Sequence, residues 1–271
     1  MPRLTAPPSL SVSRRRFLRL AAAAAGLLTT APPPLHADGG AETLHRPRLR
    51  LPASTSNGGR VPVTVETTYP LEPDHGPTVL EVINPRDPVA PKGAFHFTAA
   101  NGRAWVAFQA RFDEGSSTVA ATARCGRHGL FGATAPLVVT PGGGGCAGGV
   151  PATPSGDEIR EPVIRIPRLV ADGAIHADEL IQVQVKTRHP NRTGLAWRDG
   201  RWVAESEPFH LSRLEVVYGD EPVSTFLLTA ALSDNPLITF LLRARHEGPV
   251  RVTLTNTRGR RFEASHSIRF A

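Results

Sequence analysis

The chain has 271 residues, with 31 Lys and Arg against 24 Asp and Glu, and a formal net charge of +7. This length allows one large domain or two of ordinary size, with enough chain to bury a real core. The 40% content of hydrophobic residues excludes a disordered chain, and the two cysteines exclude a disulfide-dense scaffold. A positive charge also suggests nucleic acid as a partner, so its position along the chain matters.

The N-terminus has the pattern of an export signal. Residues 13–18 read Ser-Arg-Arg-Arg-Phe-Leu and precede an apolar run from Leu20 to Leu28. This run is too short for a membrane anchor, which needs about 20 apolar residues. The paired arginines look like the twin-arginine export signal. We expect a signal peptide over residues 1–37, cleavage after Ala37 and a periplasmic protein without a membrane anchor. An amphipathic or disordered N-terminus is the alternative.

The net charge lies mostly in this signal. Residues 1–37 hold five arginines and no acidic residue, which leaves 26 basic and 24 acidic residues and a net charge of +2. No basic cluster interleaved with aromatic side chains remains in the mature chain. The sequence therefore predicts no nucleic-acid partner.

The mature chain is predicted to be all-β. Apolar residues alternate with polar ones at Val61, Val63 and Val65, at Phe95 and Phe97 around His96, and at Val106, Phe108, Ala110 and Phe112. A period of two is typical of strands with one buried face, and no mature stretch keeps a helical period. In the second half we expect strands over Val163–Leu169, Leu180–Thr187, Leu211–Tyr218, Val223–Thr229, Leu237–Arg243 and Val250–Thr255.

Each half is close to the roughly 100 residues of one immunoglobulin-like sandwich. Between them, residues 141–162 are so rich in Gly and Pro that they predict a mobile arm and a linker. We therefore expect two immunoglobulin-like β-sandwiches in tandem. The predicted divisions are a signal peptide over 1–37, a first sandwich over 38–140, the arm and linker over 141–162, and a second sandwich over 163–271.

The sequence contains no complete motif of an enzyme active site or of a metal site. Residues 143–148 match G-x-G-x-x-G, but Val-Pro-Ala-Thr-Pro follows at 150–154 and cannot begin the helix that a dinucleotide site needs. Cys125 and His128 stand three residues apart without a second metal-binding pair, and Met1 is the only methionine. There is no G-x-S-x-G nucleophile motif, and the Asp and Glu residues are too scattered to identify a carboxylate pair for acid–base catalysis. We expect no metal, no catalytic residue and no cofactor, and hence no enzyme.

Cys146 is the most informative residue, because glycine surrounds it. Such a cysteine has no side chains to pack with, and glycine lets the backbone bend freely and enter narrow spaces. A catalytic nucleophile is held rigidly beside a base, whereas an exposed thiol on a mobile arm suits a carrier. The other members of the arm are Gly142, Gly143, Gly144, Gly145, Ala147, Gly148 and Gly149.

The sequence suggests two possible partners for Cys146, a second cysteine and a group of cations. A disulfide between Cys146 and Cys125 is an alternative in an oxidising compartment. Arg124, Arg127 and His128 would favour the thiolate and anionic adducts if the fold brings their loop to Cys146.

The two halves resemble two known families. The first half is similar to SoxY, through Asn57-Gly58-Gly59-Arg60-Val61-Pro62-Val63-Thr64-Val65, Asn84-Pro85 and Val138-Val139-Thr140. SoxY ends in Gly-Gly-Cys-Gly-Gly; here the arm is internal, and Ala147 is inserted. The second half resembles SoxZ, through Val185-Lys186-Thr187, His189-Pro190, Thr193-Gly194, Asn235-Pro236, Phe240, Gly259 and Phe262-Glu263-Ala264-Ser265. The family's His-Pro-Met is His-Pro-Asn here.

This resemblance implies a fused SoxY–SoxZ protein whose two immunoglobulin-like sandwiches pack on each other. Cys146 would then carry sulfur as a covalent adduct, in place of a cofactor, in the periplasmic oxidation of thiosulfate. The implied partners are a c-type cytochrome, a sulfate-releasing hydrolase and a sulfane dehydrogenase. Fused SoxYZ-like proteins also accompany quinoprotein dehydrogenases, so a carrier or accessory module for such an enzyme is the alternative function. A structural tandem sandwich with a Cys125–Cys146 disulfide is the third.

Overall fold

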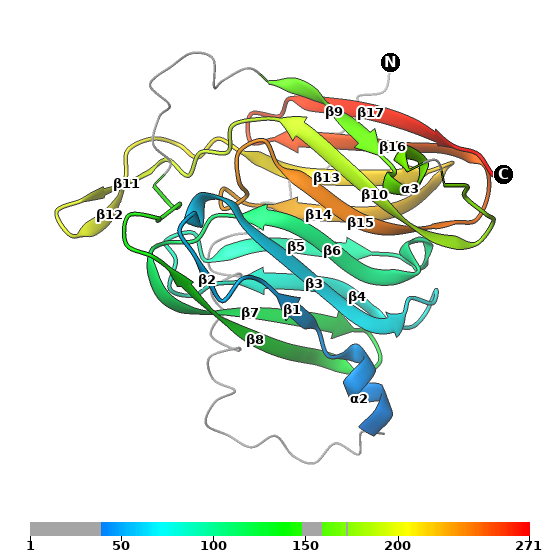
Figure 1. Ribbon diagram of the computed structural model, residues 1–271, viewed down its shortest axis with the longest axis horizontal. Coiled ribbons are helices and arrows are strands. Elements are labelled where there is room, and N and C mark those ends of the chain that lie inside the picture. Colours follow the sequence, from blue (N-terminus) through cyan, green and yellow to red (C-terminus); the bar gives the residue numbers. More distant parts are fainter. Residues whose placement is uncertain (1–38, 148–158, 172) are drawn as a thin grey trace, which may run out of the picture. The chain divides into compact units, whose positions relative to one another are not determined.

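The computed structural model describes residues 39–147, 159–171 and 173–271 (Figure 1). The expected signal peptide, Gly148 and Gly149 lie outside these residues. Residues Gly39–Ala271 group into one compact unit. Within the described part of the chain, no helix has both the length and the apolar character needed to span a bilayer.

The first half, residues 39–147, is built mainly from strands. Its short helices are α2 (Gly39–His45), the 3₁₀ turn η2 (Gly58–Arg60) and the 3₁₀ turn η3 (Ala99–Asn101). Its strands are β1 (Arg48–Arg50), β2 (Ser54–Thr55), β3 (Val61–Pro70), β4 (Pro77–Ile83), β5 (Pro91–Phe97), β6 (Arg103–Ala110), β7 (Gly115–Cys125) and β8 (Gly129–Val139).

The second half, residues 159–271, follows the same plan with one helix, α3 (Pro167–Val170). Its strands are β9 (Arg160–Arg165), β10 (Glu179–Arg188), β11 (Leu195–Arg198), β12 (Arg201–Ala204), β13 (Leu211–Tyr218), β14 (Glu221–Leu228), β15 (Leu237–Ala244), β16 (Gly248–Asn256) and β17 (Arg261–Ile268).

The two large sheets run without a break from one half into the other. One sheet has the strand order β1-β3-β6-β15-β10-β9, and the other has the order β17-β16-β13-β14-β5-β4-β7-β8-β2. The halves therefore meet at two antiparallel pairs, β6 with β15 and β5 with β14. In Figure 1 the strands of the first half, blue to green, continue directly into those of the second half. The two sandwiches are thus joined through hydrogen-bonded strand edges as well as through the chain.

The alternating patterns predicted the buried faces correctly. Val61, Val63 and Val65 are buried, and so are Phe95, Phe97 and the four apolar residues from Val106 to Phe112, while His96 between the two phenylalanines is exposed. Burial of every second side chain is what a sandwich requires of each strand. In the second half, the strand predictions from Leu180 onward are confirmed to within about two residues.

Two local predictions differ from the structure, and one hairpin was not predicted. The strand expected over Val163–Leu169 ends at Arg165, because Pro167 has no N–H for the ladder and instead begins helix α3. That strand, β9, also begins at Arg160, inside the segment expected to be linker. The β11–β12 hairpin has strands of four residues each, too short for an alternating pattern to reveal.

Phe226 on β14 tests whether the two halves are stabilised together. It is fully buried, and its ring contacts Phe95 and Phe97 of the first half, with centroids 5.2 and 5.4 Å away. We expect Phe226→Ala to lower the free energy of unfolding by about 3–5 kcal/mol. Chemical denaturation should still show a single transition, because both sheets cross the junction.

The matched control is Val170→Ala, which shortens a side chain that is 70% exposed and should change stability by no more than about 0.5 kcal/mol. Two separate transitions, with only one of them shifted by Phe226→Ala, would show that the halves fold independently.

Candidate functional site

The described part of the arm, residues 141–147, lies against the fold. Cys146 has 0% of its surface exposed, and Gly145 is buried as well. The expectation of an exposed thiol on a projecting arm is therefore wrong for this structure. What the structure presents is a docked arm, with its sulfur covered.

Main-chain hydrogen bonds hold the arm in place. The Gly145 N–H donates to the Phe112 carbonyl at 2.9 Å, and the Gly58 N–H donates to the Gly143 carbonyl at 2.6 Å. At the start of the arm, the Gly142 N–H donates to the Glu114 carboxylate at 2.9 Å. These contacts use the backbone of the arm and do not involve the sulfur atom.

The glycines are required because backbone packs directly on backbone. A Cβ atom on Gly145 would lie 2.3 Å from the carbonyl group of Gly58, and one on Gly143 would lie 2.6 Å from the Ser56 oxygen. Gly58, in turn, would bring a Cβ to 2.5 Å from the Phe112 oxygen. Such distances are shorter than real contacts allow, so both the arm and the Asn57-Gly58-Gly59-Arg60 segment need glycine for docking.

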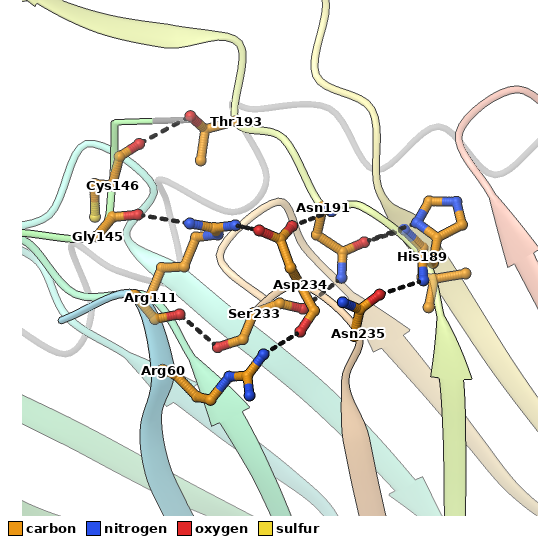
Figure 2. Close-up of polar contacts among 12 residues, drawn as sticks. Arg60, Arg111, Gly145, Cys146, His189, Asn191, Thr193, Ser233, Asp234 and Asn235 are labelled. Carbon is orange, nitrogen blue, oxygen red and sulfur yellow. Dashed lines mark hydrogen bonds and ion pairs between the residues drawn. The ribbon is translucent and has the colours of Figure 1, made fainter. Parts of the chain in front are cut away.

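Both halves of the protein contribute to the docking site (Figure 2). From the first half, the Arg111 guanidinium donates to the Gly145 carbonyl at 3.0 Å. From the second half, the Thr193 hydroxyl donates to the Cys146 carbonyl at 2.9 Å. Arg111 also forms an ion pair of 2.8 Å with Asp234 of the second half. The arm thus lies where the two halves meet.

A buried polar network positions Asp234. Asn191 donates its main-chain N–H to the Asp234 carboxylate and its side-chain amide to the Ser233 carbonyl, both at 2.7 Å. Asn191 Oδ1 accepts from His189 Nδ1 at 3.3 Å, and His189 Nε2 accepts from Asn256 at 3.3 Å. Burial lowers the pKa of His189 to about 4, so the ring is neutral and suits this donor–acceptor pair. The His189-Pro190-Asn191 segment is therefore structural, behind the docking site.

The environment of Cys146 favours the neutral thiol. Burial raises the pKa of Cys146 to about 12; nearby Lys92 and Arg111 oppose the increase, and the carboxylates of Asp87 and Asp113 add to it. Lys92 is itself fully buried and forms an ion pair of 2.5 Å with Asp87. Each cation near the sulfur therefore already has a carboxylate partner. In the docked state Cys146 is a protected thiol.

The fold does not bring the loop of Arg124, Arg127 and His128 to Cys146, so the condition for its expected effect on the thiolate is not met. That loop lies at the far end of β7, where His128 contacts Cys125 at 3.6 Å. The arm instead binds beside Phe112 and Glu114, just before β7 begins. The 11 residues of β7 separate these ends by about 33 Å.

This separation also excludes the Cys125–Cys146 disulfide in the described fold. Both cysteines are free thiols. A disulfide needs Cα atoms within about 7 Å of each other, several-fold closer than the two ends of β7. Among the described residues, the side chains that could together hold a metal ion are also at the Cys125 end, remote from Cys146.

The sequence singled out Cys146 but did not predict most of the residues that surround it. Lys92, Arg111, Thr193 and Asp234 come from four separate segments, and each resembles an ordinary surface residue in the sequence. The available signal was indirect: the glycine pair at Gly58 and Gly59 lies outside any alternating pattern, which is typical of a place where backbone must approach closely.

We expect Gly145→Ala to release the arm, because the new methyl group would overlap Gly58. Cys146 should then react with an alkylating reagent at pH 8 at least about tenfold faster than in the parent protein, since burial no longer blocks access. Gly132→Ala on β8 is the matched control, because its Cβ meets nothing closer than 3.9 Å. The measurement is alkylation followed by mass spectrometry, with Cys125 as internal reference.

The pH dependence of this reaction gives a second readout. A raised pKa favours the protonated, docked thiol, so docking should weaken as the pH rises above the ordinary thiol value of about 9.0 toward 12. Alkylation of the parent protein should therefore keep rising well above pH 9, whereas in Gly145→Ala it should level off near pH 9. Equal rates and equal pH profiles in the two proteins would contradict a buried thiol.

Comparisons with known proteins agree with this division into halves. The family model described as sulfur oxidation protein SoxY matches residues 39–146, and that described as sulphur oxidation protein SoxZ matches residues 171–267. No match was found among curated proteins. Solved structures that overlap with the chain include two variants of superoxide reductase (neelaredoxin) from Ignicoccus hospitalis, each of which covers 42% of this chain. They have identities of 22% and 19% and TM-scores of 0.36 and 0.31, and 96% and 83% of their own chains are covered.

A beta-glycosidase from Bacteroides vulgatus overlaps with 82% of this chain and 24% of its own, at 11% identity and a TM-score of 0.24. These overlaps are too loose to inform function. The two family models, in contrast, match the two halves of one compact β-sandwich unit, in the order that the sequence predicted. The chain belongs to the SoxY and SoxZ families and is a fused SoxY–SoxZ protein of the sulfur oxidation system.

Proposed function

We propose that this protein is a periplasmic carrier that holds sulfur covalently on Cys146 and presents it to other enzymes, without catalysing a reaction itself. The observation that carries the proposal is the docked arm: a lone thiol on a glycine segment whose backbone is hydrogen-bonded to groups from both halves. A carrier needs a nucleophile that is covered when empty and can leave the protein surface when loaded.

The loading step is an oxidation. The Cys146 thiol and thiosulfate form a new S–S bond to give a cysteine S-thiosulfonate, and one proton and two electrons are released. The resemblance supplies the oxidant class, a c-type cytochrome that accepts the electrons. Hydrolysis of the outer S–S bond of this adduct would then release sulfate and leave a persulfide, which a sulfane dehydrogenase can oxidise further.

Charge explains how loading would release the arm. The adduct places an anionic sulfonate next to a sulfur that has 0% exposure in the docked arm. Burying an anion without a partner is costly, and Lys92 and Arg111 already pair with Asp87 and Asp234. The loaded arm is therefore expected to leave its site, which exposes the adduct to a partner.

The docking energy is suited to a reversible contact. Each of the arm's hydrogen bonds contributes a net stabilisation of about 1 kcal/mol. Ordering the backbone of each arm residue costs about 1–2 kcal/mol. Burying one unpaired charge costs several kcal/mol, which is enough to shift such a contact toward release.

The partners proposed are other proteins of the sulfur oxidation system. Because the arm continues into the second half, a partner must admit a loop with chain on both sides rather than a free tail. Fusion keeps the two halves together at high effective concentration, which suits a docking site built from both. The alternative role beside a quinoprotein dehydrogenase uses the same fold, so the experiment must ask whether Cys146 itself is needed.

Sulfur adducts should be found on Cys146 in protein isolated from the periplasm of cells that oxidise thiosulfate. Intact-mass and peptide mass spectrometry should show added masses of thiosulfonate or persulfide on the arm peptide. Cys146→Ser should remove these masses and abolish thiosulfate-dependent growth, because no other described thiol is near the docking site.

Cys125→Ser is the matched control, since it removes the other thiol about 33 Å away and should leave the adducts unchanged. Adducts that map elsewhere, or normal thiosulfate oxidation with Cys146→Ser, would refute the carrier role. Normal quinoprotein dehydrogenase function with Cys146→Ser, lost on deletion of the chain, would support the accessory role.

A further inference from the structure

A second cluster of reactive side chains lies at the end of the first half remote from the arm. It consists of His45, His75, Cys125 and His128, each of which offers one ligand atom, and these atoms all lie within 4.8 Å of one another. His75 Nε2 is 3.1 Å from His128 Nδ1, and the Cys125 sulfur is 3.6 Å from the same nitrogen. Nothing in the proposed carrier chemistry uses these groups.

Three separate segments bring the cluster together. His45 is the last residue of α2, and His75 lies in the turn between β3 and β4. Cys125 ends β7, and His128 follows in the turn to β8. Because Pro77 of β4 pairs with Cys125, the turn that holds His75 lies beside the thiol. Cys125 and His128 alone lack a recognised metal-binding spacing, so sequence alone predicted no site here.

The distances match a tetrahedral metal site. Zinc binds nitrogen at about 2.0–2.1 Å and thiolate at about 2.3 Å, so two nitrogen ligands lie about 3.3 Å apart and a nitrogen and a sulfur about 3.6 Å apart. The two close pairs around His128 have these separations already. Small rotations of side chains would bring the remaining atoms, now within 4.8 Å, to the same spacing.

An outer layer of side chains orients the histidines. The Tyr69 hydroxyl hydrogen-bonds to His75 Nδ1 at 2.6 Å, which leaves Nε2 to face the cluster. Metal-bound histidines usually engage their second nitrogen in this way. His45 is fully buried and packs between aromatic rings, with its centroid 4.2 Å from Tyr69 and 5.4 Å from Phe131.

The imidazoles are suited to donate lone pairs. The rings of His45, His75 and His128 lie close together, with centroids 4.8 to 5.3 Å apart. Neutral imidazole is a common metal ligand through either ring nitrogen. The four donors include no carboxylate, which disfavours calcium and magnesium, and imidazole with thiolate suits zinc.

We propose that His45, His75, Cys125 and His128 bind one first-row transition-metal ion in tetrahedral geometry, with zinc as the best fit. Four protein ligands leave no open position, which is typical of a structural site. The ion would tie α2 and the β3–β4 and β7–β8 turns together. The site is separate from the carrier cysteine by the length of β7, and it stands or falls independently of the carrier proposal.

The test uses the full chain, stripped with a chelator and titrated with Co(II) as a spectroscopic probe and with Zn(II). We expect one ion per chain, a thiolate-to-cobalt charge-transfer band, loss of that band on addition of zinc, and a higher Tm with zinc. Cys125→Ser should abolish the band, and His128→Ala, at an exposed position where folding is safe, should weaken binding by about 100-fold or more.

Three further variants separate this site from others. Tyr69→Phe should weaken binding by about 10–100-fold through His75 alone. Cys146→Ser should leave the band unchanged, and so should His266→Ala on β17, in the other half. The proposal is overturned if no band forms, if the band survives Cys125→Ser, if it is lost with Cys146→Ser, or if folded His128→Ala binds cobalt as the parent does. The last result would leave the four side chains as a hydrogen-bonded cluster only.

Discussion

Arg111 joins the parts of the molecule on which the docked arm depends. Its side chain holds the Gly145 carbonyl and forms an ion pair with Asp234, so it contacts the arm and the second half at once. Its main chain also contacts both halves. The N–H donates to the Ala231 carbonyl at 2.6 Å, and the carbonyl accepts from buried Lys92 at 2.8 Å. Removing this side chain would leave the carboxylate, the arm and the junction without their shared partner.

The sheets explain why this arrangement is stable enough to function. Because β5 pairs with β14 and β6 with β15, the position of Asp234 and Thr193 relative to Arg111 is fixed by continuous hydrogen-bonded ladders. A thiol that is fully covered in the docked arm needs both walls of its site to stay in register. The metal site proposed at the other end of β7 would add rigidity to the same half without touching the arm.

The sequence was sufficient for the architecture but only partly so for the site. Alternation at Val61–Val65 and at Phe95–Phe97 identified strands with one buried face, because burial in a sandwich has a period of two. Cys146 stood out because no packing role fits a cysteine among glycines. The burial of Cys146 could not be predicted from the same pattern. Glycine allows an arm to project into solvent and equally allows it to pack on other backbone. The arm packs here because Gly58 and Phe112 lie where its backbone can bind them.

The residues that were missed share one property. Lys92, Arg111, Thr193 and Asp234 act through contacts between segments far apart in the chain, and so do His45 and His75 beside Cys125. Spacing rules detect ligands and partners that lie close together in sequence. Ion pairs and clusters assembled by sheet topology leave no such spacing, and a pattern of strands does not by itself say which loops meet.

Hydrogen exchange of the arm amides distinguishes a docked arm from a released one. We expect the arm to be docked when Cys146 is a thiol and to leave its site when the sulfur carries an anionic adduct. Exchange measured by mass spectrometry should show the Gly145 N–H, bonded to Phe112 at 2.9 Å, protected in the reduced protein and exposed after conversion to the S-thiosulfonate. Protection that is unchanged by loading, or absent in the reduced protein, would show that loading does not release a docked arm.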